Sequence, residues 1–145
     1  MHLIIFDVVP ALLSWEDPDA PAEAVPSAPE VLDRLYPHFR MIAVTDGGRT
    51  TAALRHHLED ADLALFFDGI STTTPYGPEL SPRVALRVAR AAGAGLGQAA
   101  VVTGREHLAT TLRQAGVPVV FVAAPDGLDM VPMALESLRS GWIIP

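Results

Sequence analysis

The chain has 145 residues, a formal net charge of −7 and a mean hydropathy of +0.30. This length and apolar content predict one globular domain over residues 1–145. The negative charge argues against nucleic-acid and anionic-membrane partners, which require clustered cations, and the absence of cysteine excludes disulfides and thiolate zinc sites. The sequence shows no secretory signal and no apolar stretch of the ~20 residues that span a bilayer, so we expect a cytoplasmic protein.

Short apolar runs alternate along the chain with amphipathic stretches, a pattern typical of a parallel sheet whose strands are joined by crossover helices. The expected strands are residues 2–8, 41–45, 99–103 and 119–123, with a short strand within residues 65–70. The expected helices are residues 28–36, 49–58, 81–92, 105–115 and 130–138, and loops are expected at residues 10–27 and 71–80. The sequence therefore predicts an α/β fold, a three-layer Rossmann-like domain with a mostly parallel sheet of five or six strands.

Several residues mark where the expected helices begin. Ser27 and Ser81 are suitable N-caps, and each is followed closely by a proline, which is favoured in the first turn. For the helix at residues 49–58, we expect Asp46 or Gly48 to be the cap.

Polar residues stand where three of the expected strands end, at Asp7, Thr45 and Thr103. The carboxyl ends of parallel strands meet at one edge of a sheet, where open α/β folds place their binding and catalytic residues. We therefore expect these three side chains to converge in one crevice.

Four segments carry a resemblance to a known family. Residues 6–12 read Phe-Asp-Val-Val-Pro-Ala-Leu, residues 43–47 read Ala-Val-Thr-Asp-Gly, residues 66–71 read Phe-Phe-Asp-Gly-Ile-Ser, and residues 101–116 begin Val-Val-Thr-Gly-Arg. In this order they resemble the motifs of the haloacid dehalogenase (HAD) superfamily of phosphohydrolases, whose first motif is Asp-x-Asp-Gly-Thr-Leu. The resemblance covers nearly the whole chain and implies a HAD-like fold. The loop at residues 13–25 is too short to fold as the cap domain that members often insert there, so we expect no cap domain.

The resemblance implies a role for each matched position, and most of the catalytic positions are replaced. Asp7 stands where the family's nucleophile attacks phosphorus, but Val9 stands where a second Asp protonates the leaving group. Gly77 replaces the family's lysine, and the chain contains no lysine at all. The family's magnesium ligands fall near Thr103 and Leu108, which cannot replace carboxylates. We therefore predict no metal site and no cofactor, with weak Mg²⁺ binding at most.

The turn after the second strand is better preserved. Thr45 offers a hydroxyl, Gly47 and Gly48 permit close approach of the backbone, and Arg49 adds a cation that can fork onto a phosphate. The helix that follows directs its amino end at the crevice, and helix N-termini attract anions. These four residues, together with Thr103, are the candidate anion-binding residues. The alternative is a plain turn with Arg49 in solvent.

These observations favour a catalytically impaired HAD-like domain, a pseudo-phosphohydrolase that acts in binding, regulation or scaffolding, with Asp7 as a vestigial nucleophile position. We expect a protein partner or a homo-oligomer, and a small anionic ligand at most. The apolar residues 141–145 are expected to dock either on the chain's own sheet edge, as a sixth strand, or on a second subunit. Two alternatives stay open. One is an active phosphohydrolase that uses Asp7 as nucleophile, with Arg83 or Arg105 in place of the lysine. The other is an anion or nucleotide sensor at residues 45–49.

Overall fold

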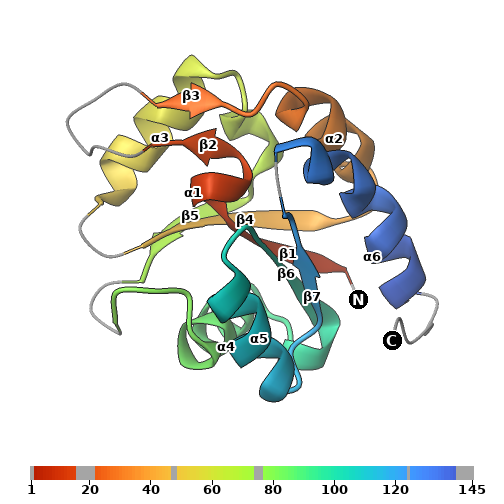
Figure 1. The fold of residues 1–145 in the computed structure, drawn as a ribbon. Coiled ribbons are helices and arrows are strands. Elements are labelled where there is room, and N and C mark those ends of the chain that lie inside the picture. The colour runs from red at the N-terminus through yellow and green to blue at the C-terminus, as the bar shows by residue number, and fades with distance from the viewer. Residues whose placement is uncertain (1, 16–21, 47–48, 74–76, 124, 140–145) are drawn as a thin grey trace.

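The computed structural model describes residues 2–15, 22–46, 49–73, 77–123 and 125–139. At its centre is a five-stranded sheet in the order β5-β4-β1-β6-β7, in which each neighbouring pair is parallel (Figure 1). The strands are β1 (Leu3–Asp7), β4 (Arg40–Thr45), β5 (Gly69–Thr72), β6 (Ala99–Thr103) and β7 (Val119–Phe121). The predicted parallel α/β fold is confirmed.

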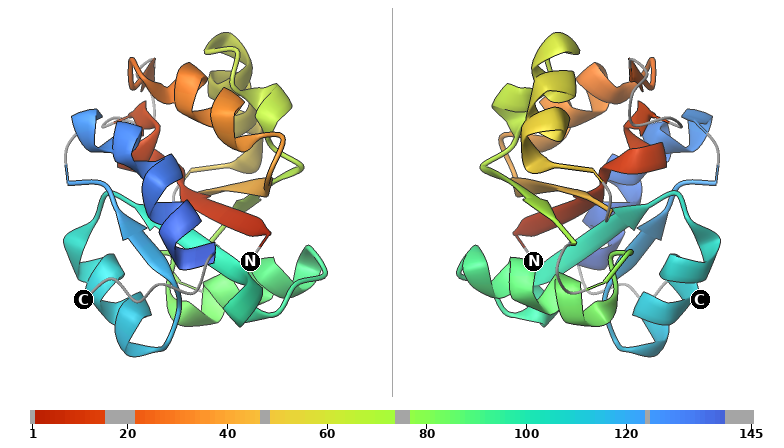
Figure 2. Two further views of the ribbon diagram at one scale, coloured as in Figure 1. Left: turned by 90° about the vertical axis from the view of Figure 1, so that its right-hand side faces the viewer. Right: turned by 90° about the vertical axis from the view of Figure 1, so that its left-hand side faces the viewer.

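Helices cover both faces of this sheet, as Figure 1 and Figure 2 show. One face carries α2 (Ala28–Leu35), α3 (Thr51–Asp60) and α6 (Val131–Arg139), and the other carries α4 (Pro82–Ala91) and α5 (Glu106–Gln114). Because both faces are covered, the central strands β1, β4 and β6 are apolar through their middle residues and do not alternate with polar ones. In β1, Ile4 and Phe6 pack in the core under the first group of helices, whereas Leu3 and Ile5 pack under the second. The predicted three layers are therefore confirmed.

The segment that follows β1 is more ordered than the loop predicted at residues 10–27. It contains the short helix α1 (Val8–Ala11) and an antiparallel pair of two-residue strands, β2 (Leu13–Ser14) and β3 (Glu23–Ala24). Trp15 follows β2 and is buried. Strands of two residues leave no periodic pattern in a sequence, which is why this hairpin was not predicted. The described part of the segment forms no cap domain, in agreement with the expectation.

The short strand expected within residues 65–70 begins there, at Gly69, but it extends beyond that range. The apolar residues there begin with a 3₁₀ helix, η1 (Ala64–Phe66), and the strand β5 comes afterwards, partly inside the expected loop. Apolar residues occur here because they pack against other elements. The ring of Phe66 makes an edge contact with Tyr36, and the ring of Phe67 makes one with Phe6. An apolar run in which tertiary packing decides the conformation cannot be distinguished from a strand by composition.

The other predicted elements agree with the structure to within two residues at each end. Two further 3₁₀ helices, η2 (Leu96–Gln98) and η3 (Pro125–Met130), precede β6 and α6. Within the described part of the chain, none of the helices is both long enough and apolar enough to cross a membrane. Residues 141–145, whose docking was left open above, lie outside the described residues.

The expected N-cap residues are confirmed at α2 and α4, and the cap of α3 is a different residue. Ser81 caps α4 as predicted, since its hydroxyl accepts a hydrogen bond from a backbone N–H three residues later at 3.3 Å. Ser27 precedes α2 but makes no capping hydrogen bond with its side chain. For α3 the cap is Thr50, whose hydroxyl accepts a backbone N–H at 3.0 Å, and not Asp46. The other residue proposed for that role, Gly48, lies outside the described residues. The carboxylate of Asp46 is therefore available for other contacts.

Candidate functional site

The carboxyl ends of β4, β1 and β6 lie side by side and carry Thr45, Asp7 and Thr103. The hydroxyl of Thr103 donates to Oδ2 of Asp7 at 2.8 Å, across 96 positions of the sequence. All three side chains are buried, with exposed fractions of 1%, 2% and 0% respectively. The predicted convergence of these residues is confirmed, and Asp7 lies deep at the centre of the group.

Arg105 is the cation of this site. Its Nε lies 3.6 Å from Oδ2 of Asp7, and its Nη2 donates to Oδ2 of Asp46 at 2.6 Å. Nε and Nη2 also donate to the carbonyl of Val9, at 3.3 and 3.0 Å. The guanidinium thus joins two carboxylates and the backbone that follows β1. Arg83, the other arginine considered as a replacement for lysine, lies exposed on α4, on the far face of the sheet from α3.

Arg49 lies against the protein rather than in solvent. Its Nη1 donates to Oδ1 of Asp46 at 2.6 Å, and its Nη2 donates to the carbonyl of Trp15. The guanidinium lies 4.9 Å from the centre of the Trp15 ring, an arrangement in which a cation is attracted to an aromatic face. The alternative that places Arg49 in solvent is therefore wrong. Asp46 holds both arginines, and Gly47 and Gly48 lie outside the described residues.

Burial acts on the pKa values of both Asp7 and Arg105. Burial raises the pKa of Asp7 from 3.8 to about 6, although the charge of Arg105 and the hydrogen bond from Thr103 both lower it. For Arg105, burial lowers the pKa, but Asp7 and Asp46 outweigh that effect and hold the pKa above its ordinary value. The cation of Arg105 therefore lies beside the carboxyl group of Asp7, which is a weaker acid than an ordinary aspartate side chain.

Several buried polar atoms beside this network have no hydrogen-bond partner among the described residues: the hydroxyls of Thr45 and Thr73, Nε of Arg49 and the indole nitrogen of Trp15. Thr73 follows β5, and its backbone N–H donates to the carbonyl of Thr45 at 3.0 Å, so the two threonines belong to neighbouring strands. A buried polar group without a partner costs about 1–3 kcal/mol. Such groups concentrate at sites where a ligand or water completes the hydrogen bonding.

The remaining positions of the resemblance supply no charge to the crevice. Leu108 lies on α5 and its side chain is buried in the core, and Gly77, in place of the lysine, has a φ of 144° that favours glycine. The hydroxyl of Thr103 is engaged inside the protein, since it donates to Asp7 and accepts the backbone N–H of Arg105 at 3.1 Å. At these positions, therefore, the chain has neither a cation in place of the lysine nor a carboxylate in place of the metal ligands.

The described residues do not fit a magnesium site of the kind the resemblance implies. Among them, no three His, Asp or Glu side chains gather where they could hold a metal ion. Asp7 and Asp46 are both contacted by the guanidinium of Arg105, and Mg²⁺ would have to displace that cation to bind them. Magnesium takes an octahedral shell of oxygen ligands that includes carboxylates. No step of the chemistry considered below is therefore assigned to a metal.

Sequence reasoning missed the roles of Asp46, Trp15 and Thr73. Asp46 was assigned to a helix cap because aspartate is a common cap residue, but two arginines compete for it. Thr73 was placed in a loop, and the position of Trp15 depends on the unpredicted hairpin. The sequence does carry one indication of these contacts. Arg105 follows the end of β6 by two residues, so it lies at the same edge of the sheet as Asp7.

The fold is that of the core domain of the HAD-like hydrolases. A hydrolase of the haloacid dehalogenase-like family from Streptococcus pneumoniae is 18% identical with a TM-score of 0.59, over 69% of this chain and 46% of that one. A HAD-superfamily hydrolase of subfamily IA, variant 1, from Geobacter sulfurreducens is 16% identical with a TM-score of 0.68, over 86% and 91%. A haloacid dehalogenase-like hydrolase from Xanthomonas campestris is 14% identical with a TM-score of 0.63, over 84% and 60%.

These identities establish a shared fold and leave catalysis open. This chain spans less than half of the S. pneumoniae protein, and most of the G. sulfurreducens protein. The sequence itself matches no protein-family model, and the search of curated proteins also found no match.

Proposed function

We propose that this chain is a catalytically impaired HAD-like domain that acts in the cytoplasm through binding, regulation or scaffolding, with a protein partner or a second copy of itself. The observation that carries the proposal is the state of Asp7, the residue at the family's nucleophile position. Its side chain is 2% exposed, and Oδ2 accepts a hydrogen bond from Thr103 and faces the cation of Arg105. Attack on phosphorus requires a carboxylate oxygen that a substrate can reach.

The groups that would assist Asp7 also argue against turnover. Phosphoryl transfer needs an acid for the leaving group and positive charge around the transferred oxygens. Val9 stands at the position of the acid, and its side chain is buried and apolar. Its carbonyl accepts hydrogen bonds from Arg105, which fixes that cation beside the two carboxylates. The cation is thus held by the protein rather than presented to a phosphate.

The native protein is therefore expected to hydrolyse an activated aryl phosphate no faster than a buffer blank, with and without Mg²⁺. General acid–base assistance is worth about 10²–10⁴-fold, and the missing charges remove further stabilisation of the transition state. Val9→Asp alone should restore no activity, because Gly77 and Leu108 still supply no charge. The rates are measured for the native chain, Val9→Asp and Asp7→Asn, after circular dichroism has shown that each is folded. Native turnover that disappears in Asp7→Asn would establish an enzyme instead.

An active phosphohydrolase is the alternative, and the position of Arg105 favours it. The Nε of its guanidinium lies 3.6 Å from Oδ2 of Asp7, so Arg105 places positive charge beside the nucleophile position. In that mechanism Asp7 would attack phosphorus and Arg105 would neutralise the transferred oxygens. The aryl phosphate assay separates this alternative from the proposal directly.

An anion sensor is a second alternative, and the buried hydroxyls of Thr45 and Thr73 favour it, since both lack a hydrogen-bond partner among the described residues. Inorganic phosphate is then expected to shift the amide resonances of both residues in two-dimensional NMR spectra. Thr45→Val should weaken phosphate binding by about tenfold, the equivalent of roughly 1.4 kcal/mol for one lost hydrogen bond. Thr110→Val, on the exposed face of α5, is the matched control. Equal binding by native protein and Thr45→Val would exclude this sensor.

A further inference from the structure

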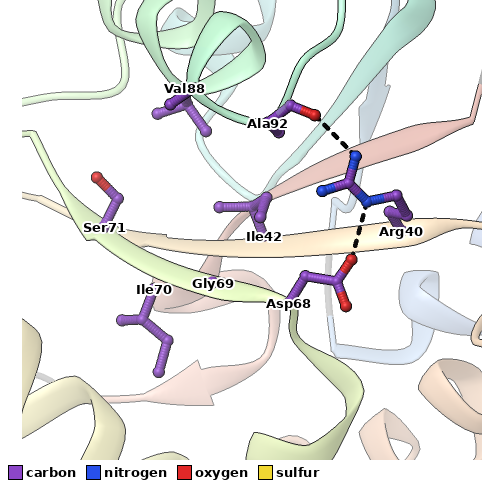
Figure 3. A pocket seen from close by; sticks show the side chains of 9 residues that line it. Arg40, Ile42, Asp68, Gly69, Ile70, Ser71, Val88 and Ala92 are labelled. Atoms are coloured by element: carbon purple, nitrogen blue, oxygen red, sulfur yellow. Dashed lines mark hydrogen bonds and ion pairs between the residues drawn. The ribbon is translucent and has the colours of Figure 1, made fainter.

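A groove runs along the outermost strand of the described sheet, β5, away from Asp7. β5 is an edge strand, since it pairs with β4 on one side and ends the strand order there. Two adjoining hollows of about 310 and 290 Å³ lie between β5 and α4, and Ser71, Val88 and Ala91 line both of them. Figure 3 shows the larger of the two. An edge strand presents backbone N–H and C=O groups to whatever lies beside it.

The groove has an apolar wall and a closed end. Ile42 and Val88 extend toward each other between the sheet and α4, while Ile70 points to the opposite side of the strand (Figure 3). Arg40 closes one end of the groove, because its Nε lies 2.9 Å from Oδ2 of Asp68 and its Nη1 donates to the carbonyl of Ala92 at 2.7 Å. This combination of a terminal strand with an apolar hollow beside it suits an extended peptide with alternating side chains.

A row of positive charge lies beside the groove. α4 contains Arg83, Arg87 and Arg90 and no acidic residue, on a chain whose net charge is −7. Their spacing of four and three residues places them on one side of the helix, and all three are exposed. Arg87 lines the hollow beside Ser71 and also the surface it shares with Arg83 and Arg90. The charge is therefore continuous with the groove.

We propose that the groove between β5 and α4 binds an extended acidic segment of a partner protein, which adds as a strand to the outer edge of β5. The edge backbone would provide main-chain hydrogen bonds, the hollow would take an apolar side chain, and the arginine row would attract acidic side chains. This surface is separate from the crevice at Asp7, so the proposal holds for an impaired enzyme and for an active one.

Two other occupants fit less well. A second copy that paired through β5 in one continuous antiparallel sheet would place two α4 helices on the same face, with their arginine rows side by side, and like charges repel. A nucleic acid would use the arginines, but it would leave the apolar hollow and the backbone edge unused.

The test uses a short blocked peptide in which valine alternates with glutamate or aspartate, and the full-length chain. This peptide is expected to bind with shifts of the amide resonances of residues 69–72, measured by NMR, and with a dissociation constant measured by fluorescence anisotropy. The same peptide N-methylated at alternate residues should lose binding, because it cannot pair as a strand. The double variant Arg83→Glu/Arg87→Glu should weaken binding by about tenfold or more, and Ala91→Trp should weaken it similarly by filling the groove.

Controls separate this surface from general effects of charge. Arg113→Glu, at the exposed end of α5, should change the affinity by less than about twofold, and Asp7→Asn should leave it unchanged. Melting temperatures show whether each variant is folded. The methylated peptide is tested against the native chain, so its result does not depend on the folding of any variant. Equal binding of the methylated peptide, an equal loss in Arg113→Glu, or preferential binding of a short oligonucleotide would overturn the proposal. So would a native dimer that dissociates when peptide is added, since the occupant is then a second copy.

Discussion

Replacement of Arg105 by methionine is expected to lower the free energy of unfolding by about 3 kcal/mol at about pH 8. Removal of one partner from a buried ion pair leaves the other charge without compensation, which costs about 3–5 kcal/mol. Here the group left behind is the carboxylate of Asp7, which is 2% exposed, and Asp46 loses one of its two arginines. For a chain of this length the melting temperature should fall by roughly 6–12 °C.

The pH dependence identifies the cause of that loss. Without Arg105, burial should raise the pKa of Asp7 still further, so the carboxyl can escape its cost by binding a proton. The loss in free energy of unfolding caused by Arg105→Met should therefore be smaller when urea unfolding is repeated at about pH 5. The double variant Arg105→Met/Asp7→Asn should recover most of the stability, and Arg113→Met is the matched control on the protein surface. A deficit of the same size at both pH values would mean that Arg105 acts through packing alone.

Replacement of Asp7 by asparagine is expected to stabilise the protein above about pH 6. The folded protein holds the pKa of Asp7 at about 6, above the ordinary value of 3.8, so the folded state binds this proton more tightly than the unfolded state. The stability contributed by the protonated carboxyl is complete below about pH 4 and is lost as the pH rises to about 6. At 1.36 kcal/mol per pKa unit, the gain in Asp7→Asn approaches about 3 kcal/mol at about pH 8.

The measurement is urea unfolding of native protein and Asp7→Asn across the range from about pH 4 to about pH 8. The difference in stability should be near zero at the acid end and should grow through the pKa of Asp7. Asp33→Asn, on the exposed side of α2, controls for the change in net charge. If Asp7→Asn is less stable than the native chain at every pH, the ionised pair of Asp7 and Arg105 stabilises the fold, and burial does not dominate.

The parts of this structure that could be predicted from the sequence are those that local patterns control. Each fully buried strand is a short apolar run, and each crossover helix has its own apolar stripe, so the alternation of elements was readable along the chain. The placement of Asp7, Thr45 and Thr103 followed from one rule about the carboxyl ends of parallel strands. The extent of the strand expected within residues 65–70 was not predicted because two phenylalanines there pack through tertiary contacts, and neighbours in the sequence carry no trace of those contacts.

The contacts of the candidate site depended on distances that the sequence does not encode. Arg105 and Asp46 are 59 positions apart, and Arg49 and Trp15 are 34 apart, so no spacing rule could pair them. The local preference of aspartate for helix caps favoured one role for Asp46, and two distant arginines imposed another. From the sequence, Arg83 and Arg105 were equivalent candidates to replace the lysine. The strand order distinguishes them, because β6 lies beside β1 and Arg105 therefore lies beside Asp7.

The position of β1 in the middle of the sheet has a consequence for how the chain folds. β1 pairs with β4 on one side and with β6 on the other, and β6 begins at Ala99. During synthesis β1 therefore emerges well before β6, and the backbone N–H and C=O groups on one of its edges stay unpaired while most of the chain is made. Pairings between segments so distant in sequence form slowly, and unpaired strand edges expose nascent chains to aggregation. We therefore expect the hydrogen bond between Thr103 and Asp7 to be among the last contacts to form.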